Sequence, residues 1–238
     1  MSMMRRSINY GNQIIEFAVV RRARKTLEIA VEPDASVVVA APLSATLEAI
    51  DQKVRKRAAW VRRKQRYFSQ FLPRTVRRRY VPGETHLYLG RQYRLRVRKG
   101  EESRVKLTRG FLLVQSQRPG CSETTRRLLM DWYSIHAERK FEERLALCLA
   151  RFPDPTEFLP SKLVIREMKK RWGSMSPSGR LQLSARLIQA PTDGIDYVIT
   201  HELCHIAEPY HGAEFFDLLG RVMPDWEKRK MRLEKMLA

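Results

Sequence analysis

The stretch from Asp196 to His205 decides how this sequence is interpreted, and it reads Asp-Tyr-Val-Ile-Thr-His-Glu-Leu-Cys-His. Its apolar residues fall on one arc of a helix, so that side can be buried while the other faces a cleft. His201 and His205 are four residues apart, which places them on one helical face, roughly 6 Å apart along the axis. The pattern therefore predicts a helix that offers two imidazoles to one metal ion.

A third imidazole would complete such a site. Catalytic zinc usually has three protein ligands and keeps a fourth position open for water. Pro209 disfavours helical geometry at the residue before it, so we expect the helix to end near Ala207 and the chain to turn before His211. His201, His205 and His211 are thus the predicted ligands of one Zn²⁺ ion per chain.

Glu202 is the predicted general base, because it lies next to the ligand face and need not bind the metal. Zinc lowers the pKa of its bound water to about 7, and a nearby carboxylate can take the proton as this water attacks a carbonyl. Glu202 would then protonate the leaving amine. The pattern predicts a zinc-dependent hydrolase that cleaves peptide bonds.

Three further residues are candidates for weaker roles around the metal. Asp196 could orient a ligand imidazole, although stabilisation of the helix N-terminus explains an acid there equally well. Trp172 could form a wall of the cleft, against the commoner role of an aromatic residue in a core. Tyr210 could donate a hydrogen bond to an oxyanion, or simply pack in the turn. Cys204 is interpreted as a packing residue.

The first half of the chain predicts strands around one basic helix. Alternating apolar residues indicate strands between Ile14 and Pro42, and again between Tyr80 and Gln117. Between them, Ser44 is the expected cap of one helix that ends near Phe71, before Pro73. No internal repeat is evident in the sequence.

Helices dominate the second half, beginning with a long one from Ser122 to the residues before Pro153. A strand at 163–168 and a hairpin arm that starts at Leu181 follow. The predicted fold class is therefore α+β, with a β-rich N-terminal part followed by a mainly helical part that contains a short β-hairpin.

Charge and turn residues place the expected domain boundary at Gly120. Residues 1–120 hold 27 Lys and Arg against 9 Asp and Glu, a net of +18, whereas residues 121–238 hold 19 against 17, a net of +2. We therefore expect a basic domain at 1–120 and a catalytic domain at 121–238. Such asymmetry favours attachment to a polyanion, with a merely solubilising surface as the alternative.

The segment from Lys53 to Arg79 contains 12 basic residues with aromatic residues among them. This mixture is typical of surfaces that track phosphates and stack bases, so non-specific nucleic acid is a predicted partner. The alternative is that the aromatic residues form the buried face of the helix.

Composition also excludes some classes of protein. No apolar run approaches the roughly 18 residues of a membrane span, and the N-terminus has no pattern of an export signal. Three widely spaced cysteines fit neither a disulfide framework nor a zinc knuckle, which favours the reducing cytoplasm.

From about residue 15 to 235 the sequence resembles the YgjP-like zinc metallopeptidases, relatives of the SprT-like and other minimal zincins. The motifs that carry this resemblance, besides the two-histidine helix, are Lys170 to Ser174, Val81 to Glu84, Tyr88 to Arg91, and His211 followed by Phe215 and Phe216. The resemblance implies a zincin-like catalytic part with His201, Glu202, His205 and His211 in the family's roles. In zincins an edge strand binds extended peptide, and the arm from Leu181 to Leu187 resembles that element.

Two other functions stay open. Some relatives in this family have been described as nucleotide pyrophosphatases, which makes hydrolysis of nucleoside triphosphates the first alternative. Against it, the chain has no Gly-rich phosphate loop and no acidic cluster for magnesium. The second alternative is a non-catalytic adaptor for nucleic acid with structural zinc, and Glu202 beside an open three-histidine site argues against it.

Overall fold

The computed structural model describes residues 4–72, 78–168 and 171–237. The chain forms two compact units that divide between Thr75 and Val76. Its fold is α+β, with a β-rich N-terminal region followed by helices, as the sequence predicts. Within the described residues, no helix is both long and apolar enough to cross a bilayer.

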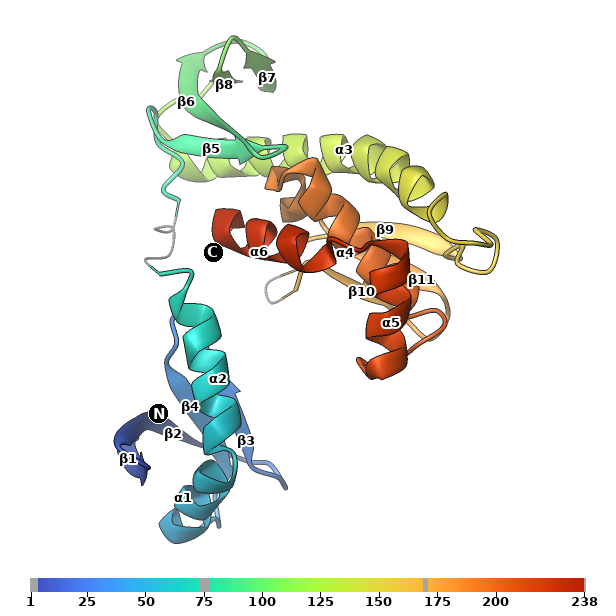
Figure 1. Ribbon diagram of the computed structural model, residues 1–238. Coiled ribbons are helices and arrows are strands. Elements are labelled where there is room, and N and C mark those ends of the chain that lie inside the picture. Colours follow the sequence, from blue (N-terminus) through green and yellow to red (C-terminus); the bar gives the residue numbers. More distant parts are fainter. Residues whose placement is uncertain (1–3, 73–77, 169–170, 238) are drawn as a thin grey trace. The chain divides into compact units, whose positions relative to one another are not determined.

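The first unit is a four-stranded sheet with two helices on one face (Figure 1). The strands lie in the order β1-β2-β4-β3, with bounds β1 (Met4–Tyr10), β2 (Gln13–Arg22), β3 (Glu28–Val31) and β4 (Val37–Pro42). The inner face of the sheet and the two helices share one buried core. Strand β1 was not expected from the sequence, because Ile8 is its only buried residue and its alternation is weak.

The two helices replace the single helix that we predicted from Ser44. Thr46 caps α1 (Leu47–Lys56), and its Oγ1 accepts a hydrogen bond of 3.2 Å from the Ala49 amide. Arg57 then leaves helical geometry, with φ −104° and ψ 6°, before α2 (Ala58–Ser69) begins. The apolar periodicity continues across this break, so the sequence pattern could not indicate that two helices are present. Residues 73–77, which include the predicted stop at Pro73, lie outside the described residues.

The second unit opens with another four-stranded sheet, in the order β5-β6-β8-β7. The bounds are β5 (Thr85–Tyr88), β6 (Arg91–Lys99), β7 (Arg104–Thr108) and β8 (Phe111–Ser116). In both sheets the two central strands are parallel and each outer strand pairs antiparallel with its neighbour. The two units therefore repeat one topology, although no repeat is evident in the sequence.

The remainder of the second unit packs against the long helix α3 (Ser122–Leu149). It contains a three-stranded sheet in the order β10-β11-β9, a short 3₁₀ helix η1 and three further helices. Their bounds are β9 (Lys162–Arg166), β10 (Gly173–Met175), β11 (Arg180–Ser184), η1 (Ala185–Gln189), α4 (Thr192–Cys204), α5 (Ala213–Val222) and α6 (Trp226–Leu237).

One strand lies in a different place from the one that we expected. The arm from Leu181 to Leu187 resembled an edge strand, but β11 is central, between β9 and β10. The parallel partner β9 is distant in sequence, and local patterns do not indicate such pairings. The two edges of this sheet are β9 and β10.

The boundary that we expected at Gly120 falls inside the second unit, because β5 to β8 pack on the segments that follow Gly120. The inner face of β8 shares its core with α3, and the β5–β6 hairpin donates backbone hydrogen bonds to η1, from Leu89 to Ile188 (2.9 Å) and from Gly90 to Gln189 (3.1 Å). Gly90 has φ +76°, and a Cβ there would lie 2.9 Å from Pro191, so only glycine fits. Divided at 75, the excess charge is spread over both units, with 15 basic against 6 acidic residues and 31 against 20.

Candidate metal centre

The three predicted histidine ligands lie together at the end of α4. Their ligating atoms are all within 4.8 Å of one another, and the Nε2 atoms of His201 and His211 are 3.0 Å apart. Nitrogen ligands around a tetrahedral zinc ion are separated by about 3.4 Å, given Zn–N bonds of about 2.05 Å. The donor set therefore fits zinc with small adjustments of the side chains. The helix ends at Cys204 rather than near Ala207, so His205 is its C-cap residue.

Two neighbours set the direction of the imidazoles. The Nδ1–H of His205 is positioned to donate to the backbone carbonyl of Glu208 at 3.0 Å, which leaves the Nε2 lone pair for a metal. The buried ring of Phe215, in the first turn of α5, lies 4.9, 4.6 and 4.7 Å from the rings of His201, His205 and His211. In the sequence, Phe215 is recognisable only as part of a family motif, and its packing against the three imidazoles could not be predicted.

The electrostatics of the cluster favour metal binding. Burial lowers the pKa of His201 to about 3, and charge on the other two histidines acts in the same direction. Burial also lowers the pKa of His211, again with His205 contributing. Because only a neutral imidazole can bind a metal, protons compete weakly for these two ligands at neutral pH.

Glu202 is buried beside the cluster, with 8% of its surface exposed. This burial raises the pKa of its carboxyl group to about 7, although a hydrogen bond from the Met175 amide and the charge of Arg171 act in the opposite direction. A Cβ atom on Gly173 would lie only 2.8 Å from Cγ of Glu202. Strand β10 can therefore run directly against this side chain, because glycine occupies position 173.

Comparison with known proteins agrees with this geometry. The model of the YgjP-like metallopeptidase domain matches residues 25–236. The chain belongs to the YgjP-like family. It is therefore a metallopeptidase-type hydrolase, for which a metal ion is the expected cofactor and protein or peptide the expected substrate class. No curated protein matched the chain.

The partners of Asp196 in this YgjP-like protein are arginines, which neither interpretation of the sequence had named. Its carboxylate does not bind an imidazole but accepts two hydrogen bonds from Arg144, at 2.7 and 2.6 Å, and one from Arg151 at 3.1 Å. Arg229 of α6 approaches it to 3.6 Å. Asp196 is buried, so it anchors α4 to its neighbours rather than orienting a metal ligand.

The other two weaker candidates do not converge on the histidines. Trp172 is half-buried and packs against the core of the second unit, while its carbonyl accepts a hydrogen bond from the Ser184 amide. Tyr210 is 84% exposed, so the structure does not place its hydroxyl in a site. The packing interpretation of Cys204 agrees with its full burial, which raises the pKa of its thiol to about 12. Lys170, part of the quoted family motif, lies outside the described residues.

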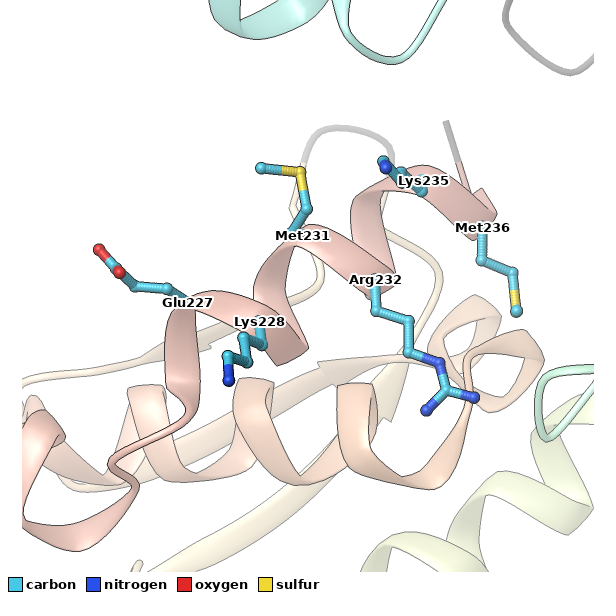
Figure 2. Close-up of a pocket in the computed structure, with 6 residues that line it drawn as sticks. All are labelled: Glu227, Lys228, Met231, Arg232, Lys235 and Met236. Carbon is cyan, nitrogen blue, oxygen red and sulfur yellow. The ribbon is translucent and has the colours of Figure 1, made fainter.

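A cavity of about 650 Å³ lies along α6, away from the histidines in sequence (Figure 2). Its lining residues come from one helix and are Glu227, Lys228, Met231, Arg232, Lys235 and Met236. Long flexible side chains form its walls, and Figure 2 shows them extending from the helix without converging on a common point. This arrangement does not bring a set of polar groups together at one point.

Proposed function

We propose that this YgjP-like protein is a cytoplasmic zinc metallopeptidase with His201, His205 and His211 as metal ligands and Glu202 as general base. The observation that carries the proposal is the convergence of three imidazoles within 4.8 Å beside a buried carboxylate. Three ligands leave a fourth position for water, as in catalytic zinc sites. Three free cysteines, two of them buried, support a reducing compartment.

The chain's own groups carry the proton steps. When bound, zinc would lower the pKa of a water molecule and polarise the carbonyl group of the substrate. Glu202 accepts the proton of the attacking water and delivers it to the leaving nitrogen. A carboxyl group with a pKa of about 7 suits both steps, because it exchanges a proton readily near neutral pH.

The free edge of β10 is the proposed place for the peptide backbone. This strand pairs with β11 on one side, and within the described residues no strand pairs with its other side. An extended peptide can add to such an edge through main-chain hydrogen bonds, which carry little sequence preference. Because Gly173 of β10 lies against Glu202, a peptide bound there would run close to the general base.

The test compares wild type with Glu202→Gln, both loaded with zinc, on an unfolded protein substrate. We expect cleavage to fall by roughly 10²–10⁴-fold while the zinc content is unchanged, because only the proton transfer is lost. Undiminished cleavage by Glu202→Gln would refute the mechanism. Release of pyrophosphate from nucleoside triphosphates, without cleavage of any peptide, would favour the pyrophosphatase instead.

A further inference from the structure

Strand β6 places a row of arginines on the face of its sheet that is opposite α3. Leu95 is fully buried on the inner face, while Arg94, Arg96 and Arg98 are exposed. Alternate residues of a strand point to the same face, at a spacing of roughly 6.6 Å. The three guanidinium groups therefore form a regular row, with a repeat similar to that of an extended polynucleotide backbone.

The neighbouring strands complete this surface. In the register of the sheet, Phe111, Leu113 and Gln115 of β8 lie beside the arginine row. Strand β7 adds Arg104 opposite Gln115 and Lys106 opposite Leu113. We call this surface the basic face, and it consists of Arg94, Arg96, Arg98, Arg104 and Lys106 around Phe111, Leu113 and Gln115. A row of uncharged side chains, one of them aromatic, thus lies between two cationic rows.

Pairing with acidic residues does not account for these charges. Within the described part of the chain, none of Arg94, Arg96 and Arg98 forms an ion pair, and Arg104 only approaches the exposed Glu102 at 3.9 Å. The guanidinium group of Arg96 lies 3.3 Å from the centre of the Phe111 ring. Five cations on one face without an acid among them repel one another through space, so an anionic partner would relieve this repulsion.

The first unit provides an internal comparison. Its sheet has the same strand order and directions, and the corresponding face carries Arg5 and Arg22 against Glu16 and Glu28. The charges on that face balance, whereas the basic face has five cations and no acid. The topology alone therefore does not produce the basic face.

The predicted nucleic-acid segment fits such a partner less well. In α2, Trp60 packs against the core of the first unit, and Phe71, just beyond the helix, is buried. These two rings cannot stack on bases without unfolding the unit. Phe111, in contrast, lies on a sheet face that no helix of the second unit covers within the described residues (Figure 1).

We propose that the basic face binds single-stranded nucleic acid. The cationic rows of β6 and β7 neutralise phosphates, and the Phe111 ring together with the Arg96 guanidinium stacked on it offers a planar surface on which an unpaired base stacks. Both interactions tolerate any sequence, because every nucleotide has a phosphate and every base has a π face. A duplex hides its bases, so it would use only the charges. This proposal does not depend on the peptidase activity.

The experiment measures binding of a fluorescent oligothymidylate to the full chain by anisotropy, at several salt concentrations. The test variant changes Arg94, Arg96 and Arg98 to Gln. The matched control changes Arg55, Lys56 and Arg63 of the first unit to Gln, which removes the same charge from exposed helical positions. Phe111→Leu tests stacking at constant charge, and circular dichroism verifies that each variant is folded.

We expect the β6 variant to bind at least tenfold more weakly than wild type. The magnitude of the slope of log K against log salt should fall by about 2, since each phosphate contact contributes about 0.7 on a single strand. The affinity of the control variant should fall by less than about threefold, and the affinity of Phe111→Leu should fall by about fivefold or more. Equal losses in the β6 and control variants would overturn the proposal, because net charge alone would then explain binding. So would an absence of binding by the wild type at about 50 mM salt, where contacts to phosphates are strong.

Discussion

Replacing Asp196 by Asn should destabilise the second unit more than any other conservative change to a charged residue of α4. The Asp196 side chain is 3% exposed and faces Arg144, Arg151 and Arg229, which are 18, 30 and 21% exposed. Removal of one partner from a buried ion pair costs about 3–5 kcal/mol. The arginines keep some contact with water, which lowers the expected loss to about 2–3 kcal/mol.

The assay is thermal unfolding of the metal-free protein by calorimetry at pH 7. For a unit of this size, each kcal/mol lowers Tm by about 2–4 °C, so Asp196→Asn should lower the Tm of the second unit by roughly 4–12 °C. The matched control is Asp225→Asn, which weakens the ion pair of the 49% exposed Asp225 with Arg229. We expect a change below about 2 °C there, as for other surface pairs. Equal shifts in the two variants would refute the buried-anchor reasoning.

Three further predictions concern the metal, the general base and pH. His211→Ala should abolish most of the rise in Tm that zinc produces in wild type, because only two of the three proposed histidine ligands remain. Titration calorimetry should show weaker zinc binding, and an unchanged affinity for zinc would contradict the ligand set. Gly173→Ala should reduce peptidase activity but not zinc content, since its Cβ would displace Glu202, whereas Gly220→Ala, which has no atom within 4 Å of the added Cβ, should be neutral in the same assay. Burial lowers the pKa of His86 below that of an unfolded histidine, so the stability contributed by its neutral form is present above about pH 6.5 and is lost as pH falls below this value. In urea titrations, the free energy of unfolding should fall more steeply with decreasing pH for wild type than for His86→Gln. Identical pH dependences would exclude His86 as a cause of the loss of stability in acid.

The proximity of the three histidines could be predicted because their geometry is mostly local. His201 and His205 are four positions apart on a helix, and Pro209 forces the turn that returns His211 to the same place. Phe215 could not be assigned a role, because its contact with all three imidazoles depends on how α5 returns to α4. The partners of Asp196 were missed for the same reason, since its arginines come from distant segments of the chain.

The fold class followed from periodicity, but strand order and boundaries did not. The register that makes β11 central depends on a parallel partner that is not adjacent in sequence. The chain does turn at Gly120, as predicted. This turn does not separate two domains, because the inner face of β8 belongs to the same core as α3. Charge density along the sequence reflects the side chains that face water. It therefore does not indicate which segments share a buried core.

The hydrogen bonds from Leu89 and Gly90 to η1 bear on how the chain can be shortened. A fragment that starts at Val76 keeps the sheet of β5 to β8 hydrogen-bonded to η1, just before α4. It also retains the three histidines and the arginine row. A fragment that starts at Cys121 would strip that sheet from Leu129 and Trp132, leaving apolar side chains in water and a tendency to aggregate. We therefore expect the shortest fragment that stays in solution to include β5 to β8, and with them the basic face.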